Sequence, residues 1–175
     1  MTLELRPFTM EDEDAALRAW RDFQGKRFVF LTSYYEGQPW PEYLELLANI
    51  RAGRNLPEGH VPGAMLAAVV DGSLVGRVSV RFQLNEYLAT FGGHIGYAVI
   101  EEHRRKGYAT EMLRQALQLE TANGICSVLL TCDDDNIGSA AVIERCGGIL
   151  ESVGPDENGV LFRRYWVRSC RPLAI

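Results

Sequence analysis

The sequence predicts a mixed α/β fold in which helices cover a largely antiparallel sheet, and three observations carry that prediction. Residues 65–82 form two apolar runs joined by Asp71-Gly72, a dipeptide typical of tight β-hairpins. Residues 92–132 read as a strand, an amphipathic helix and a second strand, the pattern of a crossover between parallel strands. The chain then ends in two strands around the turn GPDENG.

Length and composition predict one domain over residues 1–175. Of these residues 47% are hydrophobic, enough for one sizeable core but too few for two domains of typical size. The net charge of −5 disfavours a nucleic-acid partner, which usually needs a basic surface. The N-terminus alternates like a strand instead of resembling a signal peptide, and no apolar run is long enough to cross a membrane. We therefore expect a cytoplasmic protein without a membrane partner.

The cysteines and histidines predict neither a disulfide framework nor a metal site. The four cysteines, Cys126, Cys132, Cys146 and Cys170, form no C-x-x-C pair. The three histidines do not stand at a zinc-like spacing from them. We expect the thiols to be reduced and buried, as in most cytosolic proteins, and we expect no metal.

The first part of the chain predicts a strand and two helices. The first residues alternate apolar and polar side chains, as a half-buried strand does. Thr9, followed by Asp12 three residues later, is typical of a helix N-cap, and an apolar stripe follows it. The aromatic-rich stretch 27–53 starts as a loop, becomes helical after Pro41, and stops at Gly53.

The rest of the chain alternates strands and helices. After the hairpin, residues 92–100 predict a strand and residues 108–124 a helix with apolar side chains at helical spacing. The short apolar run 126–132 predicts a strand buried on both faces, and residues 136–148 a helix closed by two glycines. The order is therefore strand, two helices, three strands, helix, strand, helix, two strands.

The stretch EEHRRKGYAT places a basic run immediately before Gly107, where the helix 108–124 begins. The first N–H groups of a helix lack intrahelical partners and its dipole is positive there, so this position favours phosphates. The stretch lacks the P-loop pattern and the three spaced glycines of a dinucleotide fold. Gly107 beside three cations suits a diphosphate cradle, although the basic run by itself favours a solvated helix start.

The string RRKGYA resembles the (Q/R)-x-x-G-x-(G/A) signature of the GNAT superfamily, the acyl-CoA-dependent N-acyltransferases. GYAVIEEHRRKGYATEMLRQAL resembles the family's fourth strand, pyrophosphate loop and third helix, and LLTCDDDNIGSAAVIERCGG its fifth strand and fourth helix. Six residues alone would be weakly specific, but two blocks at this separation, with the same element order over the chain, are much more so. The sequence is similar to a branch of predicted acetyltransferases, for which no substrate is implied.

The resemblance implies the GNAT fold and a place for acetyl-CoA. The fold has a central, mixed but mostly antiparallel sheet, one parallel strand pair that splays apart, and helices on both faces. The pantetheine arm pairs with the fourth strand like an added strand, and the diphosphate lies on backbone N–H groups before the third helix. The residues implied in acetyl-CoA binding are Val99, Ile100, Arg104, Arg105, Lys106, Gly107, Tyr108, Ala109, Thr110, Asn136 and Ser139. For Asn136, helix capping is an equally good interpretation.

The resemblance also implies direct transfer of the acetyl group to an amine within a ternary complex. The base that takes the amine proton is His94 or Glu86; alternatively, His94 is a hydrogen-bonded strand residue and Glu86 an ordinary surface carboxylate. A backbone N–H near Tyr97 to Val99 stabilises the thioester oxygen. The tyrosine that often acts as acid in this family falls on Ile143, which cannot donate a proton. Tyr97, Tyr108 and Cys146 are the remaining candidates for that role.

The acceptor site is implied in the aromatic stretch after the first helix. Tyr34, Tyr35 and Trp40 are the candidates for an amine pocket, although core packing explains such residues equally well. We expect an acetyltransferase that acts on a small primary amine. The alternatives are a peptide or protein N-terminus or lysine as acceptor, and a non-catalytic acyl-CoA-binding module. The last strand, VLFRRYWVRSC, could pair across a homodimer as an exposed edge.

Overall fold

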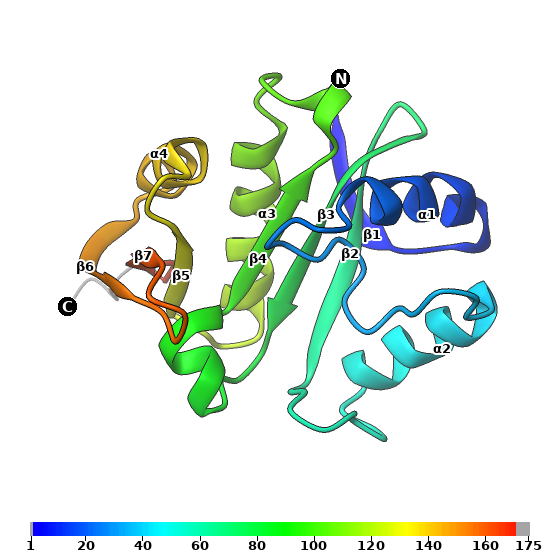
Figure 1. Cartoon of the computed structure of the whole chain (residues 1–175), viewed down its shortest axis with the longest axis horizontal. Coiled ribbons are helices and arrows are strands. Elements are labelled where there is room, and N and C mark those ends of the chain that lie inside the picture. The colour runs from blue at the N-terminus through cyan, green and yellow to red at the C-terminus, as the bar shows by residue number, and fades with distance from the viewer. Residues whose placement is uncertain (1, 171–175) are drawn as a thin grey trace.

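The computed structural model describes residues 2–170 and contains two antiparallel sheets (Figure 1). One sheet has the order β1-β2-β3-β4 and the other β5-β7-β6. The strands of the first sheet are β1 (Leu3–Pro7), β2 (Gly63–Val70), β3 (Ser73–Arg81) and β4 (Ile95–Val99). Those of the second are β5 (Ser127–Asp133), β6 (Ile149–Pro155) and β7 (Leu161–Arg168).

The helices are α1 (Glu13–Asp22), α2 (Trp40–Arg51), α3 (Tyr108–Ala122) and α4 (Ile137–Arg145). Three short helical segments, η1 (Met10–Asp12), η2 (Leu88–Gly92) and η3 (Glu101–His103), lie in the connections. The order of strands and longer helices is the one predicted from the sequence, and the mixed α/β class is confirmed.

Local signals explain several of these boundaries. Thr9 and Asp12 form the expected capping box, in which the Thr9 N–H donates to the Asp12 carboxylate at 2.7 Å. Asp71 and Gly72 both have positive φ, at 48° and 78°, as the tight hairpin between β2 and β3 requires. Gly124, at φ +83°, ends the helix of the crossover in the left-handed conformation.

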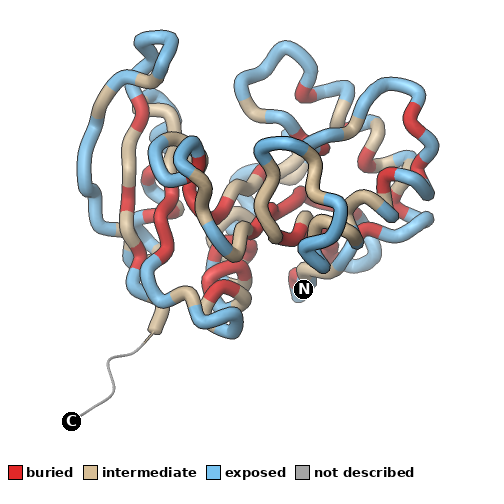
Figure 2. Tube along the Cα trace, turned by 90° about the horizontal axis from the view of Figure 1, so that it is seen from below, coloured by how far each residue is buried: buried red, intermediate tan, exposed pale blue. Residues whose placement is uncertain are grey.

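Helices cover both faces of the first sheet, because β2 alternates two sets of apolar side chains. Leu66, Ala68 and Val70 belong to the core beneath α3 and α4, whereas Ala67 and Val69 belong to the core beneath α1 and α2. Figure 2 shows buried residues along the strands and the inner sides of the helices, with the connecting loops exposed.

The β4–β5 pair diverges, so the expected central sheet is divided into two. The helix α3 carries the chain back between these strands, and β4 and β5 therefore point the same way (Figure 1). They do not form a ladder with one another: each has a ladder only on its other side. Val128, Leu129 and Leu130 of β5 are fully buried in succession, as predicted for a strand covered on both faces.

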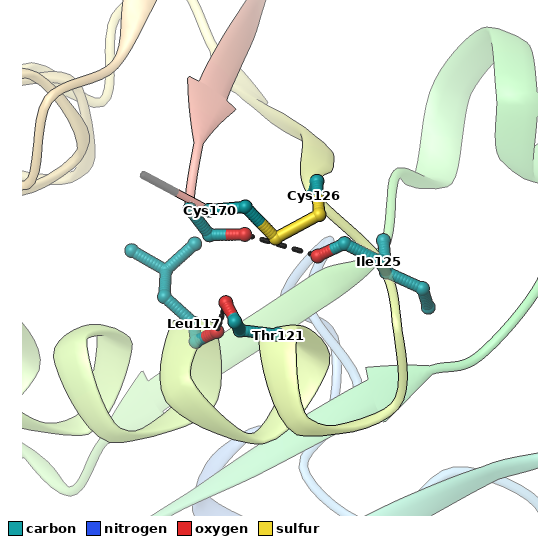
Figure 3. Close-up of a disulfide and its surroundings, with 6 residues drawn as sticks. Leu117, Thr121, Ile125, Cys126 and Cys170 are labelled. Atoms are coloured by element: carbon teal, nitrogen blue, oxygen red, sulfur yellow. Dashed lines mark hydrogen bonds between the residues drawn. A yellow bond between two sulfur atoms is a disulfide. The ribbon is translucent and has the colours of Figure 1, made fainter. Parts of the chain in front are cut away.

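The prediction that all four thiols are reduced is wrong, because Cys126 and Cys170 form a disulfide (Figure 3). Their Cα atoms lie 4.8 Å apart at the start of β5 and just beyond the end of β7, which are paired strands. The residue before Cys170 strengthens this junction, since the Ser169 N–H donates to the Cys126 carbonyl at 2.9 Å. Cys132 and Cys146 are free and half-buried. The two cysteines are 44 positions apart in the sequence, and this spacing does not indicate that folding brings them together.

The predicted edge role of the last strand is also wrong. The strand β7 lies between β5 and β6, so both of its sides are paired, and β6 is an edge of this sheet. Within residues 2–170, no helix is both long and apolar enough to span a membrane. Over the same residues, no group of three His, Cys, Asp or Glu side chains could hold a metal ion.

Candidate active site

A cleft of about 690 Å³ opens between β4 and the start of α4. Its walls come from four places that are far apart in the sequence: the loop after α1, the second half of β4, the loop leading into α3, and the region from the end of β5 through α4. The predicted ligand-binding residues that line it are Val99, Arg104, Arg105, Gly107, Tyr108, Ala109, Thr110, Asn136 and Ser139. Tyr97, predicted as a catalytic residue, also lines it.

The other end of β4 is closed by His94. The His94 N–H donates to the Leu129 carbonyl of β5 at 2.8 Å, and the Leu129 N–H donates to His94 Nδ1 at 2.9 Å. The neighbouring Gly93 has φ +66°, and a Cβ there would lie 2.6 Å from the Leu129 oxygen. The strands therefore meet at one point and separate beyond it.

The edge of β4 that faces the cleft has backbone groups directed into the opening. The Ile100 N–H donates to the Val75 carbonyl of β3 at 2.9 Å, so Ile100 turns its backbone toward β3. Alternate residues of an antiparallel strand turn their N–H and C=O groups to opposite sides. Tyr97 and Val99 therefore direct theirs away from β3, toward β5 and the cleft. An extended ligand could pair with this edge.

The prediction that Ile100 offers backbone groups to a ligand is wrong. Its N–H is bonded to Val75, and its carbonyl accepts the His103 N–H at 2.9 Å. Lys106 is exposed and does not line the cleft, unlike the two arginines before it. The error at Ile100 arises because η3 begins at the next residue and uses the Ile100 carbonyl, which the run of charged residues did not reveal. The role of Lys106 beside a diphosphate stays a prediction.

The loop before α3 has the backbone geometry of an anion cradle. Gly107 is the N-cap of α3 with φ +83°, and its missing side chain would meet no atom within 4 Å. Arg105, two residues earlier, also has a left-handed backbone, with φ +60°. Left-handed residues in such a loop turn successive N–H groups toward one side. Together with the N-terminus of the 15-residue helix α3, they form a site suited to a diphosphate.

Asn136, Ser139 and Tyr97 form a hydrogen-bonded group across the cleft. Asn136 caps α4 by accepting the Ser139 N–H at 3.0 Å, so the capping interpretation is confirmed. The Tyr97 hydroxyl and the Ser139 hydroxyl lie 2.8 Å apart. Burial raises the pKa of Tyr97 above its usual value, so the phenol stays protonated. Ile143 is fully buried in the core and has no contact role in the cleft.

Cations from the loop after α1 complete the cleft, and no local sequence pattern indicates this role. Lys26 and Arg27 both line it. Arg27 lies 2.6 Å from Asp156, in the turn after β6, and 3.6 Å from Asp133 at the end of β5. This residue therefore links the loop after α1 to the second sheet, across the open end of the cleft.

His94 and Glu86 are not placed to act as the base. His94 is 8% exposed and does not line the cleft, and its Nδ1 lone pair is occupied by the Leu129 N–H. Burial and the nearby Arg81 lower the pKa of His94. Glu86 is exposed, in the connection between β3 and β4, and does not line the cleft. His94 is thus a hydrogen-bonded strand residue and Glu86 a surface carboxylate, the two alternatives to a catalytic role.

The three aromatic residues predicted to bind the acceptor do not line the cleft. Trp40 is 1% exposed, and its indole N–H donates to the Thr9 carbonyl at 2.9 Å. Tyr34 packs against Trp40, and its hydroxyl donates to the Gln38 carbonyl at 3.1 Å. Tyr35 is 60% exposed. Two of these residues thus belong to the core beneath α1 and α2, and the aromatic residue of this stretch that lines the cleft is Phe28.

Comparison with known proteins identifies the family. A family model described as an acetyltransferase (GNAT) domain matches residues 2–149. This chain belongs to the GNAT acetyltransferase family. The family is that of the acyl-CoA-dependent N-acetyltransferases. The resemblance of its two sequence blocks to this family is confirmed.

The relatives agree with this assignment at different levels. The chain is 40% identical over 60 residues to the uncharacterized N-acetyltransferase YjdG of Bacillus subtilis (strain 168), a match that spans 32% of this chain and 34% of that protein. The structure of yncA from Salmonella typhimurium with its cofactor acetyl-CoA has a TM-score of 0.71 at 10% identity and covers 99% of this chain and 98% of its own. Mycobacterium smegmatis RimJ in complex with CoA-disulfide has a TM-score of 0.68 at 21% identity, with 95% and 81% covered. At these identities the two structures establish the fold alone.

The cleft fits acetyl-CoA. It offers backbone donors and cations at the start of α3, where a diphosphate would bind, and a strand edge without a partner strand at Tyr97 and Val99, where an extended arm would pair.

Proposed function

We propose that the protein transfers the acetyl group of acetyl-CoA to a small primary amine by direct attack. The observation that carries the proposal is the edge of β4: Tyr97 and Val99 turn backbone groups that the β3 ladder does not use into a cleft whose far end is the anion cradle at Gly107. The Val99 carbonyl accepts the Arg104 Nε–H at 3.3 Å, so a ligand that pairs there replaces this contact. In this arrangement the pantetheine arm lies along Val99, and the diphosphate lies on the first N–H groups of α3. Arg104 and Arg105 add positive charge beside the diphosphate.

The thioester is placed beside Tyr97, where the backbone N–H stabilises the carbonyl oxygen as it gains charge. The amine nitrogen forms a bond to the carbonyl carbon, and the carbon–sulfur bond breaks. The proton lost by the amine leaves to solvent, and the departing thiolate takes up a proton. The Tyr97 hydroxyl, held by Ser139 at 2.8 Å, is the donor that we assign to the thiolate.

No side chain is assigned as the base. The carboxylate that lines the cleft, Asp133, lies 3.6 Å from Arg27 and is engaged in that ion pair. We propose that water takes the proton of the amine.

The proposal is tested by measuring CoA release over a broad panel of primary amines, with wild type, Tyr97→Phe and Ser139→Ala. We expect Tyr97→Phe to lower kcat by about 10- to 100-fold while the acetyl-CoA Kd changes less than about threefold. Tyr35→Phe, exposed and outside the cleft, is the matched control and should match wild type.

Full activity of Tyr97→Phe would remove the role assigned to that hydroxyl. Tight acetyl-CoA binding with no turnover of any amine, peptide N-terminus or lysine would favour the non-catalytic binding module instead.

A further inference from the structure

Arg77 is a buried cation without a buried anion. It lies on β3 opposite Ala98 of β4, on the sheet face beneath α1 and α2, and it is 3% exposed. Its guanidinium donates to the Ser79 hydroxyl at 2.9 Å and to the Val29 carbonyl, both of which are neutral. Its Nε has no hydrogen-bond partner within the described part of the chain. Among residues 2–170, no carboxylate lies within ion-pair distance of it.

This arrangement is unfavourable for folding alone. Buried charges in proteins are normally paired, because removing an ion from water costs several kcal/mol that neutral partners do not fully return. Burial and, to a smaller extent, the nearby Arg81 lower the pKa of Arg77 to about 9. A residue such as methionine would fill the same space without this cost. An unpaired guanidinium held in a fixed position indicates a ligand anion.

The guanidinium lies next to the catalytic part of the cleft. Phe28, which lines the cleft, stacks on it with 4.2 Å between the guanidinium carbon and the ring centroid. Gly96 of β4 lies on the same side: a Cβ there would be 3.8 Å from Arg77 Nη1 and 3.1 Å from the Ser79 hydroxyl. Gly96 immediately precedes Tyr97, beside which the thioester is placed. The missing side chain at Gly96 and a turn of the Phe28 ring would give a ligand access to Arg77.

We propose that the acceptor is a small amine that also carries a carboxylate, an amino acid or a close analogue, and that Arg77 binds this carboxylate. This inference rests on the transferase function proposed above and specifies its acceptor. A guanidinium binds a carboxylate through two parallel hydrogen bonds, and the unpartnered Nε is one of the donors such a pair uses. Because the guanidinium is almost fully buried, the carboxylate must sit on a short, narrow molecule.

The experiment compares matched acceptors in a CoA-release assay. The panel contains the twenty amino acids, the carboxamide of each, and the amine left when each carboxylate is removed. Wild type should prefer at least one amino acid over its two neutral counterparts by about 10- to 100-fold in kcat/KM, the effect of one hydrogen-bonded charge pair. Arg77→Met should abolish that preference by lowering kcat/KM for the amino acid alone, and Arg77→Lys should retain part of it.

Two controls keep the result interpretable. Arg164→Met removes an arginine that also donates to backbone carbonyls, those of Ala89 and Thr90, but lies outside the cleft. It should keep the wild-type preference. The acetyl-CoA Kd of Arg77→Met should equal that of wild type. Its thermal unfolding temperature should be equal or higher, because a neutral residue replaces an unpaired buried charge.

The outcomes separate this inference from the proposed function. Equal use of amino acids and their decarboxylated amines, or an unchanged preference in Arg77→Met, would overturn the assignment of Arg77 while leaving the transferase in place. Binding of acetyl-CoA without turnover of any amino acid would also overturn it. Failure of the wild type to bind acetyl-CoA would instead remove the proposed function.

Discussion

The two ends of β4 treat their hydrogen-bonding groups in opposite ways. At the closed end, His94 uses both its backbone N–H and its ring nitrogen on a single residue of β5, Leu129. At the open end, Tyr97 and Val99 turn their backbone groups into the cleft. The Leu129 N–H thus donates to the His94 ring nitrogen instead of to a backbone carbonyl of a neighbouring strand, and β4 and β5 diverge beyond this point. The cleft therefore depends on a tight junction three residues before it in the chain.

The junction should tolerate substitution far less than the open end. Gly93→Ala places a Cβ 2.6 Å from the Leu129 oxygen in a left-handed backbone, and we expect a loss of about 3–5 kcal/mol in the free energy of unfolding. Gly107→Ala has the same kind of backbone but open space, and should lose only about 1 kcal/mol. Urea unfolding of both variants measures the difference. Equal losses of unfolding free energy in the two variants would mean that the close approach of Gly93 to β5 does not affect stability.

A buried glutamate near the junction should make stability depend on pH. Glu120 of α3 is fully buried, and over residues 2–170 neither of its carboxylate oxygens has a hydrogen-bond partner. Burial raises its pKa to about 7, from an unfolded value of 4.5. Between pH 4.5 and 7 the native state therefore holds a proton that the unfolded state has released. The resulting contribution to the free energy of unfolding is fully present below pH 4.5 and is lost as the pH rises through 7.

Glu120→Gln should remove that dependence and stabilise the protein by up to about 3 kcal/mol above pH 8. Urea unfolding from pH 5 to 8.5 measures it, with Glu157→Gln, an exposed carboxylate, as the control. If the two variants have the same pH profile as wild type, Glu120 does not titrate in this range.

The elements of the fold could be predicted because their signals are local. Asp71-Gly72 specifies a hairpin by its backbone alone, and the capping box of Thr9 and Asp12 lies within four residues. The cradle at Gly107 could be predicted in the same way, because the glycine and the start of the helix are adjacent in the chain. In each case the residues that determine the feature are neighbours in the sequence.

The features that could not be predicted are contacts between distant residues. Nothing near Cys126 indicates that Cys170 will lie beside it after β7 pairs with β5. Phe28 and Trp40 are both aromatic residues of one stretch, yet one lines the cleft and the other lies in the core. Arg77 is one charged residue in an apolar run of the sequence. Its role depends on the side chains that surround it in three dimensions, such as Phe28.

The central claim, that the open end of β4 and the loop at Gly107 bind acetyl-CoA, is tested most directly by calorimetric titration of acetyl-CoA into wild type, Gly107→Glu and Gly124→Glu. Both glycines have φ +83° and open space around them, at opposite ends of α3, so both variants carry similar backbone strain. Only Gly107 lines the cleft. We predict tight binding by wild type and Gly124→Glu, and at least about a 100-fold weaker Kd for Gly107→Glu. Equal binding by both variants, or none by wild type, would contradict the account.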